Sequence, residues 1–364
     1  MLYGLCHLPA RRPAALTTAG TPVPPPPTRR WISLPPCGAA PPVSVERGLL
    51  LAAASAFAVV SGVNDGGTLI ALSIRTYAVD LRVAVGVLVA AVAVGPFLVG
   101  TAVATTLAHR LVSFERSGGG SALLVSVAAS LAVVFALSRL GTPTSLTLAL
   151  TGAIVGAGLG AGFPVSWGVV GMVLAIGLAA PLVSIVAGFA ALRLLGGPPG
   201  RFIARRSARI AQHAGLVAQS LAYSANDAQK MVAVMAIAIA PRLDPVPVRA
   251  ASQAALTAFF ALGMLFGVRP IAGQVGERLI RIRPSNAIAT AFSSSAVVFT
   301  SAFLGAPISS TQSATMALLG TGMGGSPRHV RWPEVLRVGR AWAVTLPLAV
   351  GLAAGGSALV RVMR

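Results

Sequence analysis

The stretch Tyr223-Ser-Ala-Asn-Asp-Ala-Gln-Lys230 places two charged residues inside an otherwise apolar segment, and its lysine is the only one in the chain. A second stretch, Ser61-Gly-Val-Asn-Asp-Gly-Gly-Thr68, carries the same Asn-Asp pair at an offset of 162 residues. The other six acidic residues lie at the ends of apolar segments or between them. A charge at the centre of a bilayer costs at least about 2.5–3.5 kcal/mol. Two aspartates at matching positions, Asp65 and Asp227, therefore indicate a functional site.

The composition of the whole chain is that of a membrane protein. Of its 364 residues, 55% are hydrophobic and 10% are charged, whereas a soluble protein carries about 25% charged residues. The 28 Lys and Arg residues give a net charge of +20, but they are grouped in short clusters between long apolar runs. That arrangement is typical of the cytoplasmic loops of membrane proteins rather than of nucleic-acid-binding proteins. The two cysteines, Cys6 and Cys37, lie near the N-terminus, so we expect no disulfide framework, zinc site or thiol catalyst in the apolar body.

Residues 1–45 are rich in Pro and Arg and form a region of their own. Such a composition can neither bury a core nor propagate a helix. We expect a disordered tail there, or residues translated from a start codon assigned too early; a Pro-rich partner-binding segment is the alternative. The rest of the chain is expected to form a transmembrane repeat at 46–196, a basic cytoplasmic linker at 197–208 and a second transmembrane repeat at 209–364.

Ten apolar segments follow the tail, and roughly 20 residues suffice to cross a bilayer. The segments lie at about 47–75, 83–108, 121–140, 142–162, 165–193, 210–240, 248–268, 285–304, 306–325 and 333–360. The first and the sixth contain the Asn-Asp stretches, whose Gly and Asx residues we expect to break the helix and to expose half-helix N-termini. The number of spans stays open between six and ten, because 121–162 is either two spans or one re-entrant hairpin.

The two sets of five segments match each other. Gly141–Gly160 aligns without a gap with Gly305–Gly324 and shares nine of its twenty residues, which together with the Asn-Asp offset indicates a duplication. Loops at equivalent positions differ in charge. Fifteen arginines fall on one side of the membrane, and four on the other, when the cytoplasmic loops are placed at 75–82, 193–209, 269–283 and 328–340. The sequence therefore predicts an all-α polytopic membrane protein with two inverted repeats, broken helices, re-entrant hairpins and extracytoplasmic termini.

Two further matched stretches, Gly141-Thr-Pro-Thr-Ser-Leu-Thr147 and Gly305-Ala-Pro-Ile-Ser-Ser-Thr311, combine a proline with hydroxyls. Proline ends the preceding helix, and hydroxyls in the first turn of the next helix cap it or donate to a ligand. Together with the Asn-Asp stretches they would offer hydroxyls, amides, helix N-termini and one lysine to an anion. Two carboxylates beside them would repel that anion unless a cation or proton accompanies it. The pattern favours cation-coupled anion transport.

These motifs resemble the inorganic phosphate transporter (PiT) family over about residues 47–362, most specifically in the Asn-Asp-Ala-Gln-Lys run. The resemblance implies an inverted-repeat permease, multi-pass in the cell membrane, that moves inorganic phosphate with sodium or protons as the coupling ion. It implies no catalytic residues, no cofactor, no metal beyond sodium and no nucleic-acid partner. Membrane lipid would surround the protein, and a homodimer is left open.

The resemblance also implies a division of the site. The cation or proton would be held by Asp65 and Asp227. Phosphate would be bound by Asn64, Ser145, Thr147, Asn226, Gln229, Lys230, Ser309, Ser310 and Thr311. In the first hairpin Leu146 and Leu148 stand where the family usually has Thr and His, so we expect the second hairpin to be the stronger half-site.

Three other functions are alternatives to phosphate transport. A sulfate permease of the same architecture is the nearest, but sulfate at neutral pH carries no proton to donate to a buried carboxylate. Two intramembrane aspartates could also form an aspartyl protease, which would not need matching hydroxyl hairpins. A non-transporting scaffold leaves the polar stretches unexplained.

Overall fold

A computed structural model describes residues 45–74, 79–114, 117–139, 144–196, 205–239, 246, 248–271, 283–325 and 330–364. The predicted tail at 1–45, except for its last residue, lies outside the described residues. So do Gly141, Thr142 and Pro143 of the first predicted hairpin and the first part of the linker, at 197–204.

The described part of the chain is helical, and its only β-type pairing is a single bridge between Val112 and Val165. Among these helices, seven are long and apolar enough to cross a membrane, which makes the protein a multi-pass membrane protein. They are α1 (Val45–Ser61) with its continuation, α3 (Leu81–Val99), α5 (Gly119–Arg139), α7 (Trp167–Gly196), α10 (Ala250–Ile271), α12 (Pro284–Phe303) and α14 (Trp332–Val362).

Two shorter helices follow the predicted hairpin prolines. These helices, α6 (Leu146–Ala161) and α13 (Ser310–Gly325), have 16 residues each. At 1.5 Å per residue each is about 24 Å long, less than the roughly 30 Å of the hydrocarbon core. Their length therefore suits the predicted hairpins, in which a helix starts inside the membrane.

The Asn-Asp stretches interrupt the α-helices in a way that the sequence did not reveal. Between α1 and α2 (Gly67–Ile74) the chain forms a π-helical turn, η1 (Gly62–Gly66), and between α8 (Arg205–Tyr223) and α9 (Gln229–Ile239) it forms η4 (Ser224–Ala228). The residues that flank these turns keep right-handed helical dihedrals. The expectation of non-helical breaks with half-helix N-termini at these two places is therefore wrong. A π turn keeps the backbone groups paired, as a bilayer demands, and still redirects the side chains.

The predicted span at 83–108 is also shorter than expected. Helix α3 ends at Val99, because Gly100 adopts a left-handed φ of +87°. The chain then continues as a four-residue helix, α4 (Ala102–Thr105), and a π turn, η2 (Thr106–Arg110).

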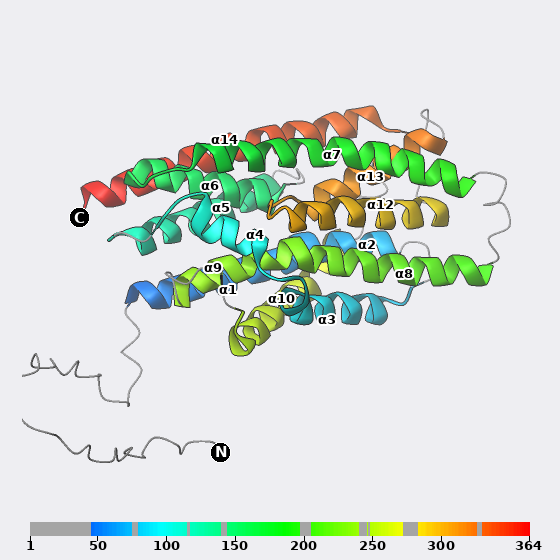
Figure 1. The fold of residues 1–364 in the computed structure, drawn as a ribbon, viewed down its shortest axis with the longest axis horizontal. Helices are drawn as coiled ribbons and strands as arrows, with labels where there is room; N and C mark the ends of the chain where they lie inside the picture. The colour runs from blue at the N-terminus through cyan, green and yellow to red at the C-terminus, as the bar shows by residue number, and fades with distance from the viewer. Residues whose placement is uncertain are drawn as a thin grey trace, which may run out of the picture. The chain divides into compact units, whose positions relative to one another are not determined.

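Each of the two short helices packs against a long helix from the other half of the chain. Helix α6 packs along α14, and α13 packs along α7 (Figure 1). Gly156 and Gly320 occupy matching positions, and a Cβ on them would lie 2.2 Å from the Val350 carbonyl oxygen and 2.0 Å from that of Ile185. Each hairpin helix thus lies directly on the last helix of the other half. A duplicated chain would give this reciprocity, and the inverted orientation of the repeats stays a prediction.

Candidate functional site

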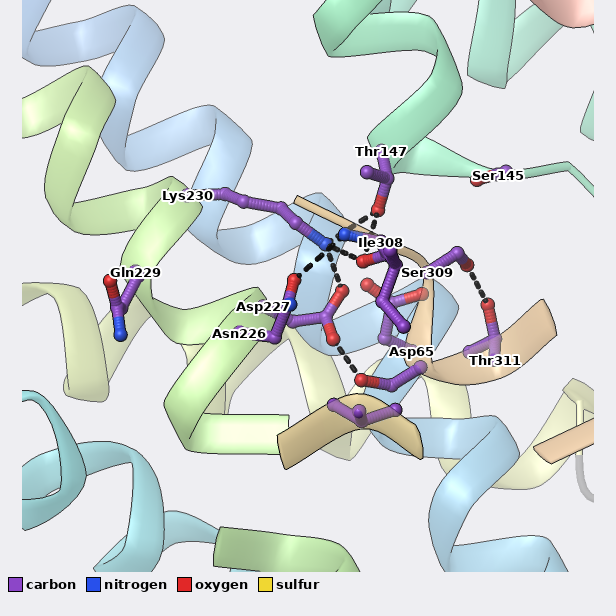
Figure 2. A network of polar contacts seen from close by, with 12 residues as sticks. Asp65, Ser145, Thr147, Asn226, Asp227, Gln229, Lys230, Ile308, Ser309 and Thr311 are labelled. Atoms are coloured by element: carbon purple, nitrogen blue, oxygen red, sulfur yellow. Dashed lines mark hydrogen bonds and ion pairs between the residues drawn. The ribbon is translucent and has the colours of Figure 1, made fainter. Parts of the chain in front are cut away.

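Serine residues begin both hairpin helices. Ser145 Oγ accepts a hydrogen bond from the Leu148 amide at 3.2 Å, and Ser309 Oγ accepts one from the Gln312 amide at 3.3 Å. Both serines therefore cap a helix whose first turn would otherwise leave amides unpaired inside the membrane. Figure 2 places Ser145 away from the charged residues, on the segment that leads into α6.

The ammonium group of Lys230 is held between three elements (Figure 2). Its Nζ lies 2.5 Å from each of three acceptors: Asp227 Oδ1 on η4, Thr147 Oγ1 on α6, and the Ile308 carbonyl oxygen before α13. Only 2% of the side chain is exposed. Thr147 donates its own hydroxyl hydrogen to Ile308 O at 3.2 Å. One lysine thus joins both hairpin tips to the second Asn-Asp stretch.

Asp227 uses its second carboxylate oxygen to reach α13, because Ser310 donates its hydroxyl hydrogen to Oδ2. Asp65 points into the same group of residues from η1 (Figure 2), near enough for its charge to interact with those of Asp227 and Lys230. Asn64 donates to Asp65 Oδ1 at 2.9 Å. We call Asp65, Thr147, Asp227, Lys230 and Ser310 the central cluster. All five side chains are buried.

Asn226 shapes the second hairpin rather than facing the cluster's charges. Its Nδ2 donates to Ser301 Oγ at 3.1 Å and to the Ala306 carbonyl oxygen at 3.0 Å, and its Oδ1 accepts from the Ile308 amide at 3.1 Å. The side chain is fully buried. It therefore fixes the turn that presents the Ile308 carbonyl to Lys230.

Gln229 points away from Lys230 and Asp227 (Figure 2). Its Oε1 accepts from the amides of Val103 and Ala104 at 2.9 and 3.1 Å, and its Nε2 donates to the Ala225 carbonyl oxygen at 2.6 Å. The residue before α4, Thr101, gives no side-chain cap. Gln229 thus supplies the N-terminal cap of α4 from the other half of the chain, and at the same time bonds to a carbonyl of η4.

The remaining predicted residues lie at the edge of the central cluster. Ser309 and Thr311 share a hydrogen bond of 2.9 Å between their hydroxyls. A cavity of about 380 Å³ adjoins them on the side of α7 and α14, and its lining includes the polar side chains of Thr147, Thr151, Ser309 and Gln312 next to apolar ones. Thr147 therefore lies both in the central cluster and at the wall of this cavity.

The sequence prediction left out one residue that belongs beside the site. The Tyr223 ring is fully buried against Phe260, with ring centroids 5.6 Å apart. Its hydroxyl has no hydrogen-bond partner among the described residues, and Asp65 and Asp227 are its charged neighbours. The spacing gave a signal: Tyr223 stands four residues before Asp227, a distance that places both on one helix face.

The chain is similar to known phosphate transporters both in sequence and in fold. A model of the phosphate transporter family matches residues 61–198 and 201–353. A probable low-affinity inorganic phosphate transporter of Mycobacterium bovis is 33% identical over 322 residues, which cover 83% of this chain and 74% of the relative. The protein of the same description from Bacillus subtilis is 26% identical over 317 residues, covering 84% and 94%. Among solved structures, a sodium-dependent phosphate transporter has the same fold, with a TM-score of 0.75 at 17% identity over 88% of this chain and 100% of that one.

Proposed function

The chain belongs to the phosphate transporter family, and on this basis we propose that it carries inorganic phosphate across the cell membrane together with a sodium ion or a proton. Its relatives are transporters and permeases, so the chain is not an enzyme, and the aspartyl protease alternative is set aside.

The observation that carries the proposal is the position of Lys230 between the two hairpin tips. A phosphate oxygen is well served by an ammonium, by hydroxyl donors and by helix N-termini. Lys230, Thr147 and Ser310 lie together at the starts of α6 and α13, where such donors converge. In the present arrangement the lysine is neutralised by Asp227. A phosphate that displaced part of this contact would gain the ammonium group of Lys230 as a partner. The carboxylate of Asp227 would then need another cation.

The charge of the central cluster supports coupling to a cation. With both aspartates ionised and Lys230 protonated, its net charge is −1 inside the membrane. Uncompensated buried charge is strongly unfavourable, and one monovalent cation or one proton would remove it. Carboxylates prefer cations, while neutral donors and the lysine prefer the anion. We therefore assign Asp65 and Asp227 to the coupling ion, and Lys230, Thr147, Ser309, Ser310 and Thr311 to phosphate.

Four of the predicted phosphate ligands receive a different role in this proposal. Asn226 and Gln229 would act from behind the site, Asn226 by holding the second hairpin tip and Gln229 by holding α4 against η4. Asn64 would orient Asp65, and Ser145 would cap α6.

Uptake of labelled phosphate into proteoliposomes tests the proposal. Sodium and proton gradients are imposed separately, and empty liposomes give the background. We expect accumulation that one of the two gradients drives and that an ionophore for that ion abolishes. Unlabelled sulfate in excess should leave the uptake of labelled phosphate unchanged. Inhibition by sulfate would instead favour the sulfate permease. A matched control is Asp80→Asn, because Asp80 caps α3 outside the cluster and asparagine also caps. Correctly folded protein that accumulates no phosphate under either gradient would refute the proposal.

A further inference from the structure

A second cavity, of about 310 Å³, lies outside the central cluster, where the N-terminus of α5 meets the C-terminal ends of α6 and α14. Figure 1 shows these ends together at the end of the bundle where the C-terminus lies. Helix ends that carry arginines mark the boundary between hydrocarbon and water. The cavity is therefore placed at the depth of lipid headgroups.

Two arginines line this cavity, Arg361 and Arg364. Among the described residues Arg361 has no carboxylate partner, and Arg364 makes one long ion pair, of 3.9 Å, with Glu46. The transport proposal uses neither of them. A guanidinium presents two parallel N–H donors that match a phosphate or carboxylate group. The two side chains thus supply strong anion donors without a close counterion.

A buried hydroxyl in the same cavity also lacks a partner. Ser357 is 2% exposed, and its Oγ makes no hydrogen bond within the described part of the chain. It lines the cavity together with Ser121, whose hydroxyl is already bonded to the Gly118 carbonyl oxygen at 2.9 Å. A buried hydroxyl without a partner is unfavourable, so the hydrogen of Ser357 Oγ is available to an acceptor on a ligand.

We infer that this cavity binds a phosphate-bearing anion through Arg361, Arg364 and Ser357. The shared chemistry fits two sources, the phosphodiester of an anionic lipid headgroup and free inorganic phosphate near the membrane surface. Glu46 opposes the anion, because its carboxylate lies beside both Arg364 and the first turn of α5; a Cβ on Gly120 would be 2.5 Å from Glu46 Oε1. The inference does not depend on the transport proposal, since it uses none of the cluster's residues.

The test measures the unfolding temperature of the purified full-length protein in two settings. In nanodiscs, phosphatidylglycerol mixed with phosphatidylcholine is compared with phosphatidylcholine alone. In detergent, inorganic phosphate is titrated. The variants are Arg361→Gln, Arg364→Gln and their combination. The matched control is Arg110→Gln, because Arg110 is an exposed arginine that does not line the cavity.

For a lipid ligand, phosphatidylglycerol stabilises the unaltered protein and the control alike, and the combined variant loses at least half of that stabilisation. For free phosphate, the combined variant instead loses part of the stabilisation in the detergent titration, and the part that remains comes from phosphate bound at the central cluster. In either case Glu46→Gln enlarges the increase in unfolding temperature that the anion causes, because it removes the opposing carboxylate. This variant is the deciding one if the combined arginine variant does not fold. The inference is overturned if neither the lipid nor the phosphate shift distinguishes the arginine variants from Arg110→Gln, or if Glu46→Gln leaves both shifts unchanged. The arginines would then only hold helix ends.

Discussion

The ammonium nitrogen of Lys230 lies 2.5 Å from Oδ1 of Asp227, and the two residues stand three positions apart across the boundary between η4 and α9. Both side chains are almost fully buried, at 2% and 5% exposure. Each charge is therefore tolerated because of the other. The pair connects η4 with Thr147 of α6, so its loss should destabilise the packing between these two elements.

The first prediction concerns the stability of this pair. Lys230→Met leaves Asp227 buried without its partner, and breaking a buried ion pair in this way costs about 3–5 kcal/mol. The combination of Lys230→Met with Asp227→Asn removes both charges and should cost less than Lys230→Met alone. The free energy of unfolding of the purified variants in detergent checks this. Strictly additive effects of the two substitutions would contradict the coupling.

The second prediction compares the two hairpin caps. Ser145→Ala and Ser309→Ala each remove a helix cap, worth about 1 kcal/mol of stability, so their unfolding temperatures should fall alike. Phosphate affinity should fall more for Ser309→Ala, because Leu146 and Leu148 leave the first hairpin with fewer donors and Ser309 lies next to Thr311. Equilibrium binding of phosphate to both variants decides the matter, and an equal or greater loss for Ser145→Ala would reverse the assignment.

A third prediction follows from the contacts of Gln229. Gln229→Leu leaves two amides and one carbonyl without the bonds that the side chain makes, and each unpaired buried group costs about 1–3 kcal/mol. Gln253→Leu is the matched control, since this buried glutamine makes one bond, to the Val92 carbonyl oxygen. The Gln229 variant should unfold at the lower temperature. Loss of phosphate affinity without any loss of stability would instead make Gln229 a direct phosphate ligand.

A fourth prediction concerns the crossed helix pairs. Gly156→Ala and Gly320→Ala each place a methyl group against a backbone carbonyl of the partner helix, and such overpacking costs about 1–3 kcal/mol. At Gly171 of α7 a Cβ would meet nothing within 4 Å, so Gly171→Ala should be neutral or stabilising, since alanine favours the helix. Unfolding curves of the three variants test the packing. Equal stability of all three would contradict it.

Much of the fold could be predicted from the sequence because it depends on long apolar runs and on a repeated pattern. Apolar segments as long as a bilayer is thick indicate spans, and residues 141–160 and 305–324 are similar enough to identify matching hairpins. The end of α3 at Val99 was not predicted. Gly100 is one glycine among 40, and its left-handed φ is set by the tertiary structure.

Within the site, residue types were easier to predict than side-chain directions. Asp65, Asp227, Lys230, Thr147 and Ser310 were expected together, because charges and hydroxyls inside apolar segments need partners, and the structure brings them together. The direction of Gln229 could not be predicted, since η4 is a π turn and its extra residue rotates the side chains that follow. Tyr223 was missed because an aromatic residue in an apolar segment is usually part of the core.

The most direct test of the proposed division of labour is Asp227→Asn, measured for phosphate binding and for gradient-driven uptake in the same purified protein. Asparagine keeps the shape of aspartate and one of its two acceptor oxygens but removes its charge, so the coupling ion should lose a carboxylate ligand while the phosphate donors remain. Both signals are normalised to the folded fraction, and Asp80→Asn serves as the control. We predict measurable phosphate binding and no accumulation driven by a sodium or proton gradient. Full gradient-driven accumulation by Asp227→Asn would contradict the role assigned to this carboxylate.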